Sequence, residues 1–292
     1  MTETKIRVRP AQQEDREQVL AFCGRTFEWG DYIGDVWDQW LNDPAGPLLV
    51  AVVGDQVVGT GKVTMISGSE AWLEGLRVNP AFRGQGLAQA MYEAAETTAR
   101  KRWAKVARYA TFSSNTAIHN LSERYGYRRV ARFIEFAGPA EAGPLPERLR
   151  LADAEAAEVL LATTAGLAAS GGLYAGGWHC QELRGGRLRE HIVNGEAYAM
   201  CRENRPLAVA LLSGYEPGPA LRLGYLGGNP VAVTVLAREI RALAASGGWG
   251  RVEVVLPALE TIQTAVRTAG YEPSWDQEVW IYERRLKGGR GA

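Results

Sequence analysis

The feature that most constrains the fold of this 292-residue chain is an internal repeat. The stretch EGLRVNP at 74–80 recurs as LRLGYLGGNP at 221–230, and RYGYRR at 124–129 recurs as TAGYEP at 268–273. The offsets are about 150 and about 144 residues, and the predicted opening strands near Ile6 and Leu149 lie 143 residues apart. Landmarks that keep their order at a near-constant offset indicate a duplicated domain, so we expect two copies of one fold.

Apolar periodicity predicts the elements of the first copy. The elements, in order, are a strand at 6–11, helices at 14–27 and 32–41, a hairpin that turns at Gly54-Asp55, a strand at 71–78, a long helix from 87 to about 102, a strand at 106–112, a short helix that Gly126 closes, and a strand at 127–137. This order predicts an α+β (mixed α/β) fold, in which each half is a central, mostly antiparallel, twisted sheet with flanking helices.

The segment 138–147 holds two glycines and three prolines in ten residues and is typical of a linker. We therefore expect one domain at 1–137, a second at 148–286, and a flexible, glycine-rich tail at 287–292.

Composition excludes several classes of function. The 33 basic and 33 acidic residues balance, which argues against a nucleic-acid surface. Three widely spaced cysteines and three histidines without metal-ligand spacing predict reduced thiols and no metal. The sequence has neither an apolar signal segment nor 18 uninterrupted apolar residues, so we expect a cytoplasmic protein with no membrane partner.

The segment Arg83-Gly84-Gln85-Gly86 stands between a predicted strand and the long helix. Glycine inside a helix costs about 1 kcal/mol relative to alanine, so two glycines at its start need a reason. A helix N-terminus offers unpaired N–H groups and a positive dipole end, and bare glycine backbone lets an anion reach them. Arg83 adds a charge suited to phosphate oxygens. The alternative is an ordinary turn whose glycines only ease packing.

In this context the segment resembles the acyl-coenzyme A signature of the GCN5-related N-acetyltransferase (GNAT) superfamily, Gln/Arg-x-x-Gly-x-Gly/Ala, preceded here by Val78-Asn79-Pro80. The resemblance extends to the element order over 6–136 and, more weakly, to the second half. It implies a tandem GNAT-like fold with a degenerate C-terminal copy, and acetyl-coenzyme A as the acyl donor cosubstrate. It assigns to donor binding Leu76, Arg77, Val78, Arg83, Gly84, Gln85, Gly86, Leu87, Ala88 and Asn115.

The resemblance further implies that the strand ending at Val78 splays from its neighbour and that the pantetheine arm enters the gap. The backbone N–H near Val78 would then polarise the thioester carbonyl. Glu74 is the first candidate for the general base, because a period of two places it on the same strand face as Val78. The alternative is a solvent-facing or ion-paired strand glutamate, and Glu70 is a weaker candidate at the outer end of the strand.

The general acid is less well defined. Many relatives place a tyrosine seven residues after the motif asparagine, and in this chain that position is Ser122. We take Ser122 as a catalytic candidate, with His119, Tyr125 and water as alternatives. A thiolate can leave without full protonation, so the missing tyrosine does not exclude catalysis.

Acceptor specificity in the superfamily comes largely from the first two helices and the strand loops. Here the segment 27–40 is rich in aromatic residues and carries four acids, namely Glu28, Asp31, Asp35 and Asp38. One interpretation is a pocket for a cationic, partly apolar amine. The other is a helix whose Trp37 and Trp40 pack in the core while the acids face water.

The second copy lacks the glycine turn, because Pro230 is followed by VAVTVLAREI. We therefore expect one coenzyme A per chain, bound to the first half. The resemblance implies an acetyl-coenzyme A dependent N-acetyltransferase that moves an acetyl group to a primary amine by direct attack in a ternary complex. The acceptor would be a small molecule or a peptide, and an oligomer is compatible with the sequence. The alternative is a non-catalytic acyl-coenzyme A binding or sensing protein that docks a partner.

Overall fold

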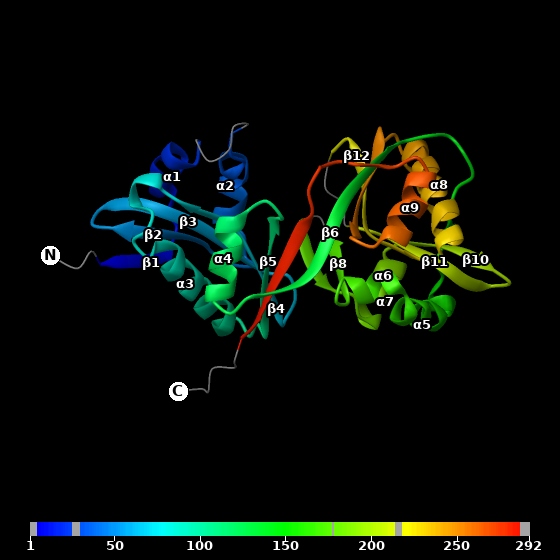
Figure 1. Ribbon diagram of the computed structural model, residues 1–292, viewed down its shortest axis with the longest axis horizontal. Coiled ribbons are helices and arrows are strands. Elements are labelled where there is room, and N and C mark those ends of the chain that lie inside the picture. Colours follow the sequence, from blue (N-terminus) through cyan, green and yellow to red (C-terminus); the bar gives the residue numbers. More distant parts are fainter. Residues whose placement is uncertain (1–4, 25–29, 177, 214–217, 287–292) are drawn as a thin grey trace. The chain divides into compact units, whose positions relative to one another are not determined.

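The computed structural model describes residues 5–24, 30–176, 178–213 and 218–286 (Figure 1). These residues form two compact units. The first comprises the described residues within 1–109, 123–127 and 283–292, and the second comprises those within 110–122 and 128–282. Each unit is therefore built from separate segments of the chain. The predicted linker at 138–147, between the two copies of the sequence repeat, stays a prediction. None of the described helices is long and apolar enough to span a membrane.

The first unit contains the elements expected from periodicity. They are β1 (Ile6–Pro10), η1 (Gln13–Asp15), α1 (Arg16–Cys23), α2 (Ile33–Leu41), β2 (Leu48–Val53), β3 (Gln56–Met65), β4 (Glu70–Val78), η2 (Pro80–Phe82), α3 (Leu87–Lys101) and the start of β5 (Val106–Phe112). The strands lie in the order β1-β2-β3-β4-β5, and every neighbouring pair is antiparallel except β4 and β5, which are parallel.

Helices cover both faces of this sheet. Leu48, Val50 and Val52 of β2 pack with residues of α1 and α2 in one apolar cluster. On the other face, a Cβ added to Gly61 would lie 3.1 Å from the Met91 side chain of α3. Glycine on β3 therefore lets α3 approach the sheet closely.

Most of the second unit repeats this arrangement. Its elements are α4 (Thr116–Arg124, which ends in the first unit), β6 (Arg128–Pro139), β7 (Glu147–Arg148), η3 (Leu151–Asp153), α5 (Ala154–Thr163), α6 (Ala165–Ala169), β8 (Leu173–Gly176), β9 (His179–Glu182), α7 (Gly185–Val193), β10 (Ala197–Arg202), β11 (Arg205–Leu212), β12 (Ala220–Gly228), α8 (Pro230–Ser246), β13 (Arg251–Pro257), α9 (Glu260–Thr268), β14 (Glu272–Pro273) and β15 (Val279–Arg285).

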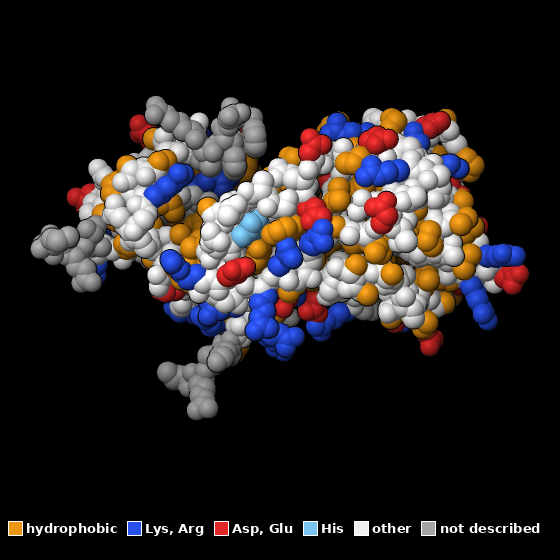
Figure 2. Space-filling model, viewed as in Figure 1, with side chains coloured by type: hydrophobic (Ala, Val, Ile, Leu, Met, Phe, Trp, Pro, Cys, Tyr) orange, Lys and Arg blue, Asp and Glu red, His pale blue; other side chains and the backbone are white. Residues whose placement is uncertain are grey.

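The strand path β7-β10-β11-β12-β13 has the same sense as β1 to β5, with antiparallel neighbours up to the parallel pair β12 and β13. Its hairpin turns at Glu203 and Asn204, which have φ of 52° and 60°, as a two-residue turn between twisted strands requires. Each half of the chain thus has the mixed α/β fold, and the two halves together form a tandem of this fold. On the second unit, basic and acidic side chains are interspersed over the face seen in Figure 2.

The end of β15 belongs to the first unit although it comes from the C-terminus of the chain. Arg108 of β5 has a side chain only 1% exposed, and it pairs with Glu70 at 2.6 Å and with Glu283 of β15 at 2.7 Å. A buried guanidinium needs such partners, since an unpaired buried charge is strongly destabilising. The C-terminal residues therefore stabilise the fold that the N-terminal residues begin.

Candidate functional site

The ladder between the parallel strands β4 and β5 is short. It runs from Glu70 opposite Val106 to Trp72 opposite Arg108, whereas β4 continues to Val78 with β3 as its neighbour. The splay that the family resemblance implies therefore begins after Trp72.

A β-bulge in β4 accompanies the splay. Thr60 pairs with Arg77 and Lys62 pairs with Glu74, so two residues of β4, Gly75 and Leu76, oppose the single residue Gly61. Gly75 has φ +65°, and a Cβ there would lie 2.5 Å from the Trp40 ring. Sequence reasoning missed this bulge, although an isolated glycine inside a strand is a signal for one.

The bulge corrects the expected position of Glu74. Residues that pair across two strands project to the same face of the sheet. The partners of Glu74 and Arg77 on β3 are two residues apart, so Glu74 and Arg77 share one face. Val78 pairs with Gly59 and projects to the opposite face. The expectation that Glu74 and Val78 share a face was wrong, because the extra residue reverses the alternation. Glu74 lies on the α1 and α2 side, half-buried, and Thr64 Oγ1 donates to its Oε1 at 3.4 Å.

The amide of Val78 points toward the open side of β4. The Asn79 N–H donates to the Val58 carbonyl at 2.8 Å, which makes Asn79 the hydrogen-bonded position opposite β3. Successive residues of an antiparallel pair alternate, so the Val78 N–H is directed away from β3. This is the orientation that a donor to an inserted thioester requires.

The glycine turn begins directly after β4. The Asn79 side chain accepts from the Ala81 N–H at 3.1 Å and caps η2, after which Gly84 and Gly86 adopt φ of +77° and +82°. No heavy atom lies within 4 Å of a Cβ built on either glycine, so packing does not require them. The positive φ explains glycine at both positions, and the open space leaves the backbone accessible.

Helix α3 starts at this turn without a side-chain cap. Its N-cap is Gly86, and its first intrahelical bond runs from the Ala90 N–H to the Gly86 carbonyl. The N–H groups of Leu87, Ala88 and Gln89 are therefore open donors at the positive end of the helix dipole. Arg83 and Gln85 are exposed beside them, and none of the described carboxylates pairs with Arg83. These groups fit an anion such as a pyrophosphate.

Arg77 and Asp31 form a buried pair on the same side of the sheet as Glu74. Arg77 Nε lies 2.6 Å from Asp31 Oδ2, and the Asp31 side chain is 1% exposed. The Arg77 guanidinium also lies 5.5 Å from the centre of the Tyr32 ring. Asp31 is thus neutralised within the protein, and the Arg77 side chain is directed to Asp31. The assignment of Arg77 to donor binding stays a prediction.

Helix α2 agrees with the packing interpretation of the segment 27–40. Trp37 and Trp40 are buried in the core, whereas Asp35 and Asp38 are exposed. Glu28 and the other residues at 25–29 lie outside the described residues.

The candidates on and near α4 are held by structural contacts. Ser122 is fully buried, and its hydroxyl donates to the Ile118 carbonyl at 2.5 Å. Asn115 Oδ1 accepts from the Ile118 N–H at 3.3 Å and so caps the helix. The assignments of Ser122 to catalysis and of Asn115 to donor binding stay predictions, and a side-chain role for either requires that its present hydrogen bond be exchanged.

The alternative acids and bases are also engaged. His119 Nε2 lies 3.0 Å from the Ser113 carbonyl and therefore donates, which leaves Nδ1 to accept from the Tyr282 hydroxyl at 3.0 Å. Tyr125 donates to Gln89 Oε1 at 3.1 Å. Glu70 is bound to the buried Arg108.

The second unit is built differently at the corresponding place. Helix α8 begins directly at Pro230, and the Asn229 side chain accepts from the Val231 and Ala232 N–H groups at 3.0 and 3.4 Å. The β12–β13 ladder also ends early, at Leu223 opposite Val254, but a Cβ on Gly224 would lie 2.0 Å from the Ala175 carbonyl of β8. Gly224 is the extra residue of a β-bulge in β12, because Leu211 pairs with Tyr225 and Leu212 pairs with Leu223. The N-terminus of α8 is therefore capped, and β8 covers the β12 bulge.

No three His, Cys, Asp or Glu side chains among the described residues are grouped so that they could hold a metal ion. A cavity of about 550 Å³ lies along α3, lined by residues from Gln89 to Arg100 together with Arg124, Tyr125, Gly126 and Arg284.

A split parallel strand pair followed by a glycine turn and an uncapped helix is the arrangement of the GNAT acetyltransferase fold. The acetyltransferase (GNAT) family model matches residues 12–127, and this part of the chain belongs to that family. The human protein described as "Probable N-acetyltransferase 16" is 35% identical over 79 residues, which are 27% of this chain and 21% of that protein. The matched stretch thus spans about a fifth of the length of that relative.

Solved structures extend the similarity to both halves. A GCN5-related N-acetyltransferase from Sphaerobacter thermophilus is 15% identical with a TM-score of 0.63, and the match covers 98% of each chain. A tandem GNAT protein from the clavulanic acid biosynthesis pathway is 15% identical with a TM-score of 0.54, over 97% of this chain and 99% of that chain. At these identities the likeness shows the fold, and the fold is the tandem one.

Proposed function

We propose that the protein is an acetyl-coenzyme A dependent N-acetyltransferase that acts on a primary amine. The observation that supports the proposal is the turn at Gly84 and Gly86. No neighbouring atom requires glycine at either position, and the turn directly precedes a helix without a side-chain cap. The amides of Leu87, Ala88 and Gln89, with Arg83 beside them, would hold the pyrophosphate of the donor.

The chemistry proposed is direct attack of the neutral amine on the thioester that the donor supplies. The Val78 N–H would donate to the carbonyl oxygen as negative charge develops on it. Glu74 would accept a proton from the amine, directly or through water. The thiol is acidic enough to leave as a thiolate, so Ser122 need not give up its bond to Ile118.

The test is release of free thiol from acetyl-coenzyme A across a panel of small amines and peptides. With an acceptor found, we expect Glu74→Gln to lower kcat about 10²- to 10⁴-fold, the usual contribution of a general base, with the donor KM unchanged. Asp35→Asn, an exposed acid on α2, is the matched control and should leave kcat unchanged. An unchanged kcat in Glu74→Gln would remove Glu74 from the mechanism.

Stoichiometry tests the role of the second unit. Calorimetry should find one coenzyme A per chain, because α8 is capped by Asn229 and β8 covers the β12 bulge. Two equivalent sites would contradict this. Binding without thiol release for any amine would favour a non-catalytic acyl-coenzyme A binding protein.

A further inference from the structure

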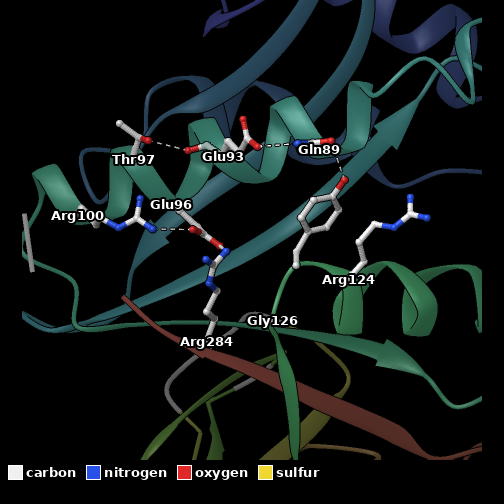
Figure 3. Close-up of a pocket in the computed structure, with 9 residues that line it drawn as sticks. Gln89, Glu93, Glu96, Thr97, Arg100, Arg124, Gly126 and Arg284 are labelled. Atoms are coloured by element: carbon white, nitrogen blue, oxygen red, sulfur yellow. Dashed lines mark hydrogen bonds and ion pairs between the residues drawn. The ribbon is translucent and has the colours of Figure 1, made fainter. Parts of the chain in front are cut away.

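The cavity along α3 has two chemically different ends, both in the first unit. At the end toward the C-terminus of α3, Glu96 binds Arg100 Nη2 and Arg284 Nη1, each at 2.7 Å (Figure 3). At the other end stand Gln89 and Arg124, and the Arg124 side chain points away from the two arginines on Glu96 (Figure 3). Arg100 and Arg284 are thus engaged within the fold, whereas Arg124 belongs to the end of the cavity that is nearer the start of α3.

Arg124 is held next to the first turn of α3 by its neighbour Tyr125. The Tyr125 hydroxyl donates to Gln89 Oε1 at 3.1 Å, and the Tyr125 ring stacks on the buried Tyr92 with the ring centres 5.8 Å apart. Gln89 is the third residue of α3, which places it about 4.5 Å along the helix axis from the N-cap Gly86. The C-terminal end of α4 is therefore anchored within about one helical turn of the open amides that follow the glycine turn.

The guanidinium of Arg124 is available to a ligand. Arg124 is exposed, and its side chain takes part in no ion pair or hydrogen bond among the described residues. The Gln89 side chain, in contrast, is used within the fold at both of its polar atoms, because Nε2 donates to Glu93 at 2.9 Å while Oε1 accepts from Tyr125. Arg124 thus adds a second available positive charge to that of Arg83 beside the start of α3.

The proposed donor carries phosphate at two places. Its pyrophosphate is assigned to the amides at the start of α3, and its ribose bears a separate phosphate monoester at the 3′ position. A monoester carries about −1.5 to −2 charges near neutral pH, so it is the most highly charged phosphate of the molecule. One ribose separates the two groups, so a donor whose pyrophosphate is held at the start of α3 brings its monoester within reach of a long cationic side chain there.

We propose that Arg124 binds the ribose 3′-phosphate of coenzyme A and makes the site selective for donors that carry this group. The inference rests on the proposed N-acetyltransferase function. The planar guanidinium can donate to two phosphate oxygens at once, and the monoester offers three. Tyr125 is a positioning residue, because its contacts with Gln89 and Tyr92 determine where α4 ends.

The test is calorimetric titration of the full chain with coenzyme A and, separately, with 3′-dephospho-coenzyme A at low ionic strength. Arg124→Gln should raise the Kd of coenzyme A about 10-fold and leave the Kd of the dephospho compound unchanged. The expected factor is at the lower end for a hydrogen bond between charged groups, because Arg124 is exposed and salt screens it.

Two further variants serve as controls. Arg83→Gln should weaken both ligands by the same factor, because Arg83 is assigned to the pyrophosphate that both contain. Arg128→Gln removes the same charge from an exposed arginine of β6 that does not line the cavity, and it should leave both Kd values unchanged.

The outcomes separate this inference from the proposed function. If the wild-type chain binds neither ligand, the proposed function fails. If it binds both and Arg124→Gln weakens both equally or weakens neither, the assignment of Arg124 is wrong while the proposed function stands. An equal loss of coenzyme A affinity in Arg128→Gln would indicate a general charge effect and would also overturn the assignment.

Discussion

Replacing Gly86 by alanine tests whether its backbone conformation serves the fold or a ligand. Gly86 has φ +82°, and a Cβ there would meet no atom within 4 Å, so the mutation creates no clash. A left-handed conformation costs an L-residue about 1–2 kcal/mol, and the stiffer unfolded chain returns about 0.4–1 kcal/mol. We expect Gly86→Ala to lower the free energy of unfolding by only about 1 kcal/mol.

The effect on coenzyme A should be larger. The new methyl group would stand beside the open N–H groups of Leu87 and Ala88, where the phosphate oxygens must approach. Loss of one or two hydrogen bonds to a charged group, about 1.5–3 kcal/mol each, predicts at least a 10- to 100-fold rise in the Kd of coenzyme A, measured by calorimetry.

Gly248 offers a matched control, because it has φ +81° and equally open surroundings in the second unit. Gly248→Ala should show the same small loss of stability in a denaturant titration with an unchanged Kd. If Gly86→Ala binds coenzyme A as tightly as Gly248→Ala does, the argument that Gly86 exists for a phosphate ligand is refuted.

Three further predictions concern stability. A chain that ends after Tyr282 loses Glu283 and Arg284, so Arg108 and Glu96 each lose one ion-pair partner. We expect its free energy of unfolding, measured by urea denaturation, to fall by about 3–5 kcal/mol. A truncated chain as stable as the full one would contradict the stabilising role of these ion pairs. Asn229→Ala removes the cap of α8 and should cost about 1 kcal/mol by the same assay, and a negligible loss would show that the cap contributes little. Burial lowers the pKa of His191 below its usual 6.5, in spite of Glu196 beside it, so the unfolded chain takes up a proton first. The stability due to neutral His191 is then complete above about pH 6.5 and is lost as the pH falls through the lowered pKa. His191→Gln should flatten this part of the pH profile of thermal unfolding, and a mutant profile identical to that of the wild type would contradict the role of His191.

Much of the fold could be predicted because local patterns decide it. The strand at 106–112 and the helix that begins at Leu87 were placed correctly, since alternation and helical spacing report directly on which side chains are buried. The tandem architecture also followed from the repeat. The Gly75 bulge was missed because alternation is assumed to continue along a strand, and the register with β3 is a tertiary fact.

The site divides in the same way. The glycine turn at Gly84 and Gly86 was visible in the sequence because its signal lies in consecutive residues. The ion-pair partners of the charged groups could not be read from the sequence. Asp31 and Arg77 are 46 residues apart, and Arg108 and Glu283 are 175 residues apart. Charge alone does not tell which carboxylate and which arginine pair with each other.

By itself, the sequence determined that the chain carries two copies of one mixed fold and that, of the two, the first has a glycine turn before its long helix. Those properties depend on short-range order, namely periodicity, glycine and the caps of helices. Tertiary structure decided which face Glu74 occupies, how α8 satisfies its own N-terminus, and that the last strand completes the first unit. Each of these depends on which distant segments pair, and pairing is selected by the burial and charge balance of the whole chain.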